Sequence, residues 1–304
     1  MANIITANHI VKRYSKHTAL NDVNINVPEG SIYGLLGPNG AGKTSLIRII
    51  NQITAPDEGE VLFFNEKMTL GHTSKIGYLP EERGLYKKMK VGEQALYLAQ
   101  LKGLNKADAL NKLRDWFKKF EIINWWDKKV EELSKGMAQK VQFIVTVLHE
   151  PSLLILDEPF SGFDPINVEL IRNELLRLKN TGSTIILSTH NMASVEELCD
   201  HITLINHSKA VLEGSVHDIR QNYKEHLWEL QFTGKEDSFT SAIENKFFPQ
   251  QIETKKGVHL IRIKIPSEFS PNDLLKTVLP VCEVHGFTEI LPSMSEIFIK
   301  AVKG

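Results

Sequence analysis

Residues 37–44 read GPNGAGKT and fit the pattern G-x-x-x-x-G-K-[ST] of a phosphate-binding loop. The mostly apolar residues 31–35 predict a buried strand before the loop, and SLIRII at residues 45–50 predicts a helix after it. In a strand, loop and helix arranged in this order, the glycines let backbone N–H groups surround phosphate oxygens. The positive end of the helix dipole points at the same oxygens. The stretch therefore predicts an α/β fold with a nucleotide site.

Two side chains of this loop have chemical roles beyond the backbone cradle. Lys43 is expected to reach the outer phosphates, and the Thr44 hydroxyl to ligate Mg²⁺. A chance match is the alternative, and the flanking strand and helix argue against it. The residues expected at the phosphates are Gly37, Pro38, Asn39, Gly40, Ala41, Gly42, Lys43, Thr44 and Ser45.

Composition limits the other possibilities. The chain of 304 residues is long enough for two domains. Its 36 basic and 37 acidic side chains nearly cancel, so the net charge does not favour binding to nucleic acid. The first residues lack the pattern of a signal peptide, and no apolar run approaches the length of a membrane span. We therefore expect a cytoplasmic chain without a nucleic-acid partner. Cys199 and Cys282 stand far apart outside any C-x-x-C pattern, which predicts neither a disulfide framework nor a zinc site.

An acidic pair follows a second buried strand. Residues 152–156 are largely apolar, as in a central parallel strand, and Asp157 and Glu158 come directly after them. Carboxyl ends of such strands border the crevice where open α/β sheets bind ligands, so a merely solvated pair is the weaker interpretation. Asp157 is expected to bind the magnesium ion, and Glu158 to accept a proton from an attacking water.

Two further side chains are candidates at the same edge. The buried pattern of residues 183–187 leads to His190, which could hydrogen-bond a terminal phosphate, although a surface histidine is the ordinary alternative. Tyr14 is expected in the connection between two amphipathic strands, residues 4–11 and 18–27. Its ring could stack on adenine, whereas a packing role is the simpler interpretation.

Between the loop and the acidic pair lies a helical insertion. Residues 75–80 predict a short strand that leads to Glu81, and residues 92–120 have helical periodicity. The sequence LSKGMAQ at residues 133–139 precedes another apolar helix. Ser134 is placed to cap that helix, and Gly136 leaves its backbone open to a ligand.

From about residue 224 the pattern changes to a regular alternation of strands and helices. Strands are predicted at 227–232, 259–265 and 283–291, and helices at 238–247, 271–281 and 293–302. This predicts a small α/β domain of 224–304 after a larger domain of 1–223. Its sequence contains no phosphate loop, acidic pair or metal-ligand spacing that would indicate a ligand.

With GPNGAGKT, LSKGMAQ, LLILDEP, SGFDP and His190 in that order, residues 1–220 resemble the ATP-binding cassette subunits of ABC transporters. The resemblance implies an α/β P-loop NTPase fold with a RecA-like core, an antiparallel β subdomain and a helical subdomain at about 88–150. ATP and Mg²⁺ are the implied ligands.

The resemblance also implies roles for individual residues. Residues 37–44 become the Walker A loop and 153–157 the Walker B strand. Ser134 and Gly136 match the signature loop, which in this family closes over the nucleotide of a second copy, so two copies would sandwich two ATP molecules. The remaining roles are adenine stacking for Tyr14, catalytic base for Glu158, D-loop residue for Asp164 and switch histidine for His190.

Two departures from the family pattern stand out. Lys135 and Met137 replace a glycine and the glutamine of the usual LSGGQ signature. Glu81 stands where the family usually has glutamine; its carboxylate can still reach Mg²⁺, but it adds negative charge and cannot donate a hydrogen bond to water. Hydrolysis could therefore be slower or differently coupled to the partner.

The stretches IGYLPEERGLY and PSMSEIFIKAV resemble the subgroup that serves ABC-2 type exporters, including bacterial sodium-extrusion systems. We therefore expect an ATP-hydrolysing subunit that powers a separately encoded membrane permease and lies on the inner face of the membrane through that partner. The alternatives are a soluble ABC ATPase and a regulatory subunit that binds ATP but barely hydrolyses it. A P-loop kinase would leave the signature and D-loop motifs without a role.

Overall fold

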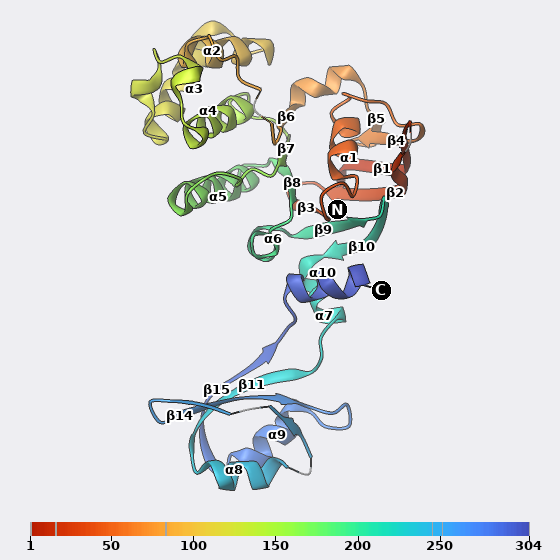
Figure 1. Cartoon of the computed structure of the whole chain (residues 1–304), viewed down its shortest axis with the longest axis vertical. Helices are drawn as coiled ribbons and strands as arrows, with labels where there is room; N and C mark the ends of the chain where they lie inside the picture. Colours follow the sequence, from red (N-terminus) through yellow and green to blue (C-terminus); the bar gives the residue numbers. More distant parts are fainter. Residues whose placement is uncertain (1, 16, 83, 245, 251, 304) are drawn as a thin grey trace. The chain divides into compact units, whose positions relative to one another are not determined.

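The computed structural model describes residues 2–15, 17–82, 84–244, 246–250 and 252–303. The chain divides into two compact units, Met1–Val216 with Ala301–Gly304, and His217–Lys300. Each unit has its own β-sheet structure and its own hydrophobic core (Figure 1).

A six-stranded sheet of order β10-β9-β3-β8-β7-β6 forms the centre of the first unit. The strands β3 (Ile32–Leu36), β7 (Leu153–Asp157) and β8 (Thr184–Thr189) are buried along their whole length, which explains their continuous apolar sequences. They run parallel with β6 (Ile76–Leu79) and β9 (His201–Asn206), while β10 (Lys209–Ser215) is antiparallel to β9. The predicted α/β class is confirmed, and the parallel strands bring their carboxyl ends to one edge.

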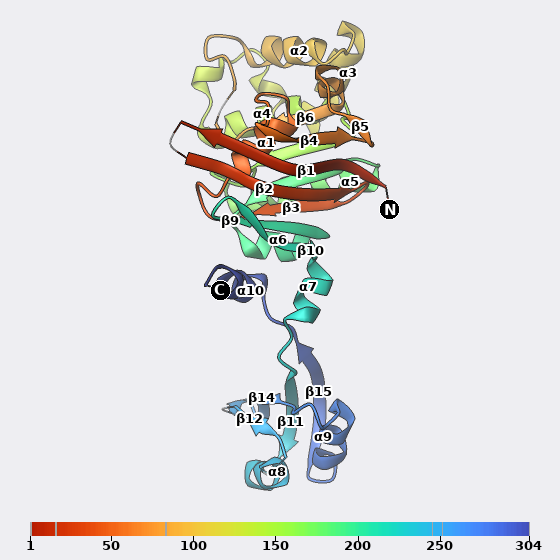
Figure 2. The ribbon, with the colours of Figure 1, turned by 90° about the vertical axis from the view of Figure 1, so that its right-hand side faces the viewer.

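An antiparallel sheet of order β2-β1-β4-β5 lies beside the first (Figure 2). It contains β1 (Asn3–Tyr14), β2 (His17–Pro28), β4 (Glu58–Phe63) and β5 (Glu66–Lys67). Helix α1 (Lys43–Ile50) shares a core with both sheets, in which Leu46, Ile47 and Ile50 are fully buried. The phosphate loop before α1 is thereby fixed between two sheets.

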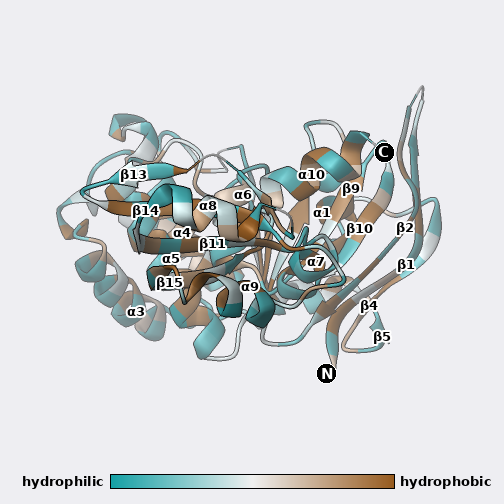
Figure 3. Ribbon diagram, turned by 90° about the horizontal axis from the view of Figure 1, so that it is seen from below, coloured by the Kyte–Doolittle hydropathy of each residue, from teal (hydrophilic) through white to brown (hydrophobic). Residues whose placement is uncertain are grey.

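The predicted helical insertion consists of separate helices. The periodic stretch 92–120 divides into α2 (Val91–Leu101) and α3 (Lys106–Lys119), because Gly103 has a φ of +93° and Asn105 caps the second helix. The ribbon of α3 is largely hydrophilic (Figure 3), and its buried residues, Ala109, Leu113 and Phe117, form one stripe. Two 3-10 turns, η2 (Ile123–Trp125) and η3 (Val130–Glu132), lead to α4 (Lys135–Val147).

Three further helices and one short turn complete the first part of the chain. They are η1 (Leu70–Lys75), α5 (Pro165–Asn180), α6 (Met192–Leu198) and α7 (Val216–Asn222).

The second unit contains an antiparallel sheet of order β12-β14-β11-β15, in which β13 also pairs with β14, and helices α8 and α9 lie on one face of it (Figures 1 and 2). Phe239 and Ile243 of α8 and Leu274 of α9 share a core with Leu230 and Ile261 of the sheet. The three predicted strands and three predicted helices are all present. Two very short strands, β12 and β13, were not predicted because two or three residues give no alternation. The elements are β11 (Leu227–Gly234), α8 (Glu236–Ile243), β12 (Phe248–Pro249), β13 (Glu253–Lys255), β14 (Val258–Lys264), α9 (Pro271–Val278), β15 (Cys282–Ile290) and α10 (Met294–Lys303).

Candidate functional site

The phosphate loop joins β3 to α1 and depends on glycines at its two ends. Gly37 has a φ of +144°, and a Cβ there would lie 2.1 Å from the carbonyl oxygen of Ile205. Gly42 has a φ of +118°, and a Cβ there would lie 2.3 Å from the carbonyl oxygen of Ala19. A side chain at either position would strain the backbone and collide with a neighbouring carbonyl. The fold therefore holds a narrow backbone cradle at the start of α1, as phosphate binding requires.

Lys43 is the cation of this cradle. Its side chain is 7% exposed, and Nζ donates to the carbonyl oxygens of Gly37 at 2.7 Å and Pro38 at 3.1 Å. Burial lowers the pKa of Lys43, while the carboxylates of Glu158, Asp157 and Glu81 oppose that shift. Three carboxylates therefore favour the charged form of a partly desolvated ammonium group.

Thr44 and Asp157 bring two oxygen ligands together from distant parts of the sequence. The Thr44 hydroxyl donates to Asp157 Oδ2 at 3.2 Å, and Asp157 is 3% exposed at the end of β7. Glu81 lines the same cavity. Hydroxyl and carboxylate oxygens are the ligands that Mg²⁺ prefers, so these residues fit the ion expected from the sequence.

Glu158 follows β7 in a strained backbone conformation, with a φ of +49°. Its N–H donates to the Ser188 carbonyl at 2.9 Å, which joins it to the neighbouring strand β8. Its carboxylate lies 2.7 Å from His190 Nδ1 through Oε1 and accepts from the Thr189 hydroxyl at 3.4 Å through Oε2. Both carboxylate oxygens are thus oriented by residues at the end of β8.

Lys43, Thr44, Glu81, Asp157 and Glu158 all line one cavity of about 350 Å³, which we call the phosphate cavity. His17 and Ala19 also line this cavity, although the sequence analysis did not predict them. The one signal in the sequence was that they follow Tyr14 within five residues. Tyr14 ends β1 rather than lying in the connection, since it still pairs with His17. The predicted residues that line the cavity are Tyr14, Asn39, Gly40, Gly42, Lys43, Thr44, Ser45, Glu81, Asp157 and Glu158.

Among the described residues, seven predicted ones do not line the phosphate cavity: Gly37, Pro38 and Ala41 belong to the same loop and His190 contacts Glu158, whereas the other three lie on other elements. Ser134 caps α4 by accepting from the Met137 N–H at 3.3 Å, and Gly136 lies in the first turn of that helix. Asp164 caps α5, and hydrogen bonds from Asn167 lower its pKa. The residues described as lining the phosphate cavity include none of these three.

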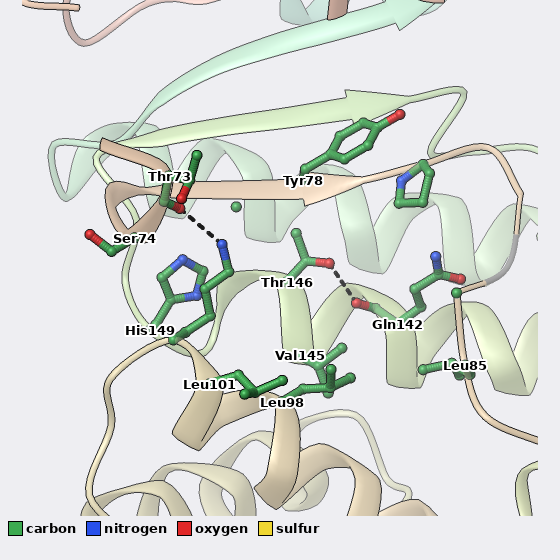
Figure 4. A pocket seen from close by; sticks show the side chains of 14 residues that line it. Thr73, Ser74, Tyr78, Leu85, Leu98, Leu101, Gln142, Val145, Thr146 and His149 are labelled. Carbon is green, nitrogen blue, oxygen red and sulfur yellow. Dashed lines mark hydrogen bonds between the residues drawn. The ribbon is translucent and has the colours of Figure 1, made fainter. Parts of the chain in front are cut away.

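A larger cavity, of about 440 Å³, lies between β6, α2 and α4 (Figure 4). Leu98, Leu101 and Val145 lie together on one side of it, and Tyr78 lies opposite. Near one end, Lys102 Nζ donates to the carbonyl oxygens of Thr73 and Ile76 at 2.9 Å. The sequence did not predict this cavity because its lining comes from segments that only the fold brings together.

A parallel sheet with a phosphate loop and an acidic strand end defines a P-loop nucleotide-binding protein. The sequence model of the family described as ABC transporter matches residues 20–161. A model described as an AAA domain, putative AbiEii toxin, Type IV TA system, matches residues 127–196. The C-terminal domain of DrrA1-3-like ATP-binding proteins matches residues 214–302.

Similar proteins span the whole chain. The uncharacterized ABC transporter ATP-binding protein YhaQ of Bacillus subtilis is 38% identical and covers 98% of both chains. The bacitracin transport ATP-binding protein BcrA of Enterococcus faecalis is 33% identical, over 91% of this chain and 92% of its own. The chain therefore belongs to the ABC transporter ATP-binding proteins, a family of ATPases.

Solved structures agree with this family. An ATP-binding subunit of an ABC transporter has a TM-score of 0.68 and 29% identity, over 72% of this chain and 93% of its own. The ADP conformation of MJ1267, an ATP-binding cassette of an ABC transporter, has a TM-score of 0.62 and 26% identity, over 72% of this chain and 93% of its own. Each helix in the described ranges is too short or too polar to cross a bilayer.

Proposed function

We propose that this ATPase powers a separately encoded integral-membrane permease that exports its substrate. The observation that carries the proposal is the convergence of Lys43, Thr44, Asp157 and Glu158 on one cavity. Tyr14 lines the same cavity, where its ring can stack on adenine. Binding and turnover of ATP would both take place there.

The proposed chemistry divides among these residues. Lys43 and the backbone of the phosphate loop bind the phosphates, and Glu158 accepts the proton of the attacking water. His190 contacts the Glu158 carboxylate, and in this proposal it would hydrogen-bond the terminal phosphate. Mg²⁺, held by Thr44 and Asp157 with Glu81 nearby, would neutralise phosphate charge.

We propose a second copy of this chain as one partner. Ser134 and Gly136 lie at the start of α4 and Asp164 at the start of α5, outside the phosphate cavity of their own chain. Helix N-termini attract phosphate oxygens, so these residues can act on nucleotide bound by another copy. ATP binding would then close a homodimer, and hydrolysis would reopen it.

The permease is the other proposed partner, and the larger cavity supports it. Leu101 of this cavity is 65% exposed, and Tyr97, which is also exposed, lies one helical turn before it on the same face of α2. Tyr97, Tyr86 and Met89 line a second hollow of about 360 Å³. Contiguous exposed apolar surface of this kind is typical of protein interfaces, and an amphipathic helix of the permease fits it.

The names of similar proteins support a role in transport, and the direction of export rests on the subgroup resemblance of the sequence. Relatives include a bacitracin transport and a lantibiotic transport ATP-binding protein, the latter SrtF of Streptococcus pyogenes with 34% identity over 67% of this chain and 88% of its own. By this analogy the chain would act in the cytoplasm, against the inner face of the membrane. The soluble ABC ATPase remains the second interpretation, and no described feature favours it.

Purification of the tagged chain from detergent-solubilised native membranes tests the proposal. A membrane protein with several spans should accompany the parent, and its recovery should fall about tenfold or more for Leu101→Glu. Leu279→Glu is a matched control, because Leu279 is also exposed but lies outside both hollows. Recovery of ribosomal or DNA-associated proteins without a membrane protein would contradict the permease.

A further inference from the structure

The N-terminal half of α4 contacts residues 161–164, SGFD, which we name the 161–164 turn. Gln139 Nε2 donates to the carbonyl oxygen of Ser161. A Cβ built on Gly162 would lie 2.6 Å from Lys135 Cε, 3.0 Å from Lys135 Cδ and 2.9 Å from Lys135 Nζ. The Lys135 side chain therefore occupies the space that Gly162 leaves by having no side chain.

This contact depends on the shape of both residues. Gly162 has a φ of +83°, which other residues adopt only with strain. Lys135 is exposed, and among the described residues its ammonium group has no hydrogen-bond or ion-pair partner. Two of its three atoms nearest to the Gly162 Cβ position, Cε and Cδ, belong to the methylene stem.

The 161–164 turn is joined to Glu158. The Ser161 N–H donates to the backbone carbonyl oxygen of Glu158 at 3.1 Å, and Glu158 lines the phosphate cavity. Gln139, Phe163 and Glu158 also line one small hollow. A displaced turn would therefore move the backbone of Glu158, which is already held at a positive φ.

Helix α4 is a firm support for this contact because α3 joins it to α5. The Trp116 ring of α3 lies 6.3 Å from the Phe143 ring of α4. Lys119 of α3 forms an ion pair with Glu174 of α5, which Arg177 Nε also binds at 2.7 Å. The helices that Ser134 and Asp164 cap are thus linked through α3 as well as through the hydrogen bond between Gln139 and Ser161.

We propose that Lys135 is a positioning residue for ATP hydrolysis: its stem holds the 161–164 turn against α4 and so fixes the direction of the Glu158 carboxylate. The inference rests on the proposed role of Glu158 as the base. It gives a function to a lysine that replaces glycine in the family signature. Because the Lys135 side chain would act on turnover and not on ATP binding, its removal should change kcat rather than the affinity for ATP.

The first test compares Lys135→Ala with Lys135→Met in the full-length protein. Lys135→Ala should lower kcat about tenfold with the KM for ATP unchanged, since small misplacements of a catalytic group are costly. Lys135→Met keeps the stem without the charge and should stay near the parental rate. Lys118→Met, at an exposed lysine of α3, is the control. A parental rate for Lys135→Ala, or equal losses in both Lys135 variants, would overturn the proposal.

A double-mutant cycle with Gly162→Ala tests the contact itself. The added methyl group should lower kcat further when the Lys135 stem is present than when Lys135 is alanine, with a coupling of at least about threefold. Strictly multiplicative losses would show that the two residues do not interact.

Glu158→Gln, measured in parallel, separates the two proposals. If Glu158→Gln turns over ATP slowly while Lys135→Ala keeps the parental rate, the proposed role of Lys135 is rejected and that of Glu158 stands. If Glu158→Gln turns over ATP at the parental rate, Glu158 is not the general base, and the proposal that Lys135 positions it fails as well.

Discussion

His190 Nδ1 lies 2.7 Å from Glu158 Oε1, although 31 residues separate the two in the sequence. The pair forms because β7 and β8 are neighbours in a parallel sheet and end at the same edge. His190 is largely exposed whereas the Glu158 side chain is 14% exposed, so the histidine covers the carboxylate from the solvent side. The arrangement orients the carboxylate that we propose as the base.

Glu158→Gln should bind ATP with parental affinity but lower kcat by about a hundredfold or more, because an amide cannot accept the proton of the attacking water. The variant should also accumulate as a dimer in the presence of ATP. Steady-state ATPase assays, nucleotide titration and size-exclusion chromatography measure the three quantities. A parental turnover rate would remove Glu158 from the role of base.

Lys43→Ala should weaken ATP binding by about tenfold to a hundredfold, the usual range for a charged hydrogen bond to an ionised partner. Its amino group also binds two carbonyls of the loop, so the melting temperature must be compared with that of the parent. Lys118→Ala is a control for the general loss of a positive charge. Unchanged affinity in a folded Lys43→Ala protein would contradict the phosphate-loop role.

Glu81→Gln should tighten ATP binding and raise turnover by a few-fold. The carboxylate adds negative charge beside the phosphates, whereas an amide can donate to a water. Glu82→Gln is the matched control, because Glu82 is exposed and does not line the phosphate cavity. Equal rates for Glu81→Gln and the parent, with the permease present, would show that this departure from the family pattern is neutral.

Much of the phosphate cavity follows from the sequence because its residues fall in short motifs at strand ends. Thr44 and Asp157 lie 113 residues apart, yet the order of motifs predicts their contact. The extent of β1 was not predictable, since residues 12–14 gain their strand conformation from pairing with β2. The Lys135 contact with Gly162 depends on how α4 packs against the turn before α5, which residue spacing does not record.

Gly92→Ala should destabilise the first unit by about 1–3 kcal/mol. A Cβ on Gly92 would lie 2.3 Å from Trp126, whose ring packs against Phe117, and overpacking of this kind displaces the backbone. Gly84→Ala is the control, because a Cβ there would meet nothing within 4 Å. Urea denaturation of both variants measures the free energy of unfolding, and equal midpoints would show that Trp126 moves aside freely.

His149 should make the fold sensitive to mild acid. Burial lowers its pKa from 6.5 to about 4, helped by the positive charges of Lys102 and Lys112 and opposed by a hydrogen bond to the Ile76 carbonyl. The unfolded chain therefore binds the proton more readily than the folded chain between pH 6.5 and pH 4. Stability falls as the pH falls through that window, by at most about 3 kcal/mol from this one group.

The variant His149→Gln removes the titrating group while its amide can still donate to the Ile76 carbonyl. Its free energy of unfolding should depend less on pH than that of the parent between pH 7 and pH 4. His217→Gln, at an exposed histidine, should retain the parental pH dependence. Parallel stability curves for His149→Gln and the parent would mean that His149 titrates alike in the folded and unfolded chains, and that burial in the cavity between β6, α2 and α4 does not restrain its protonation.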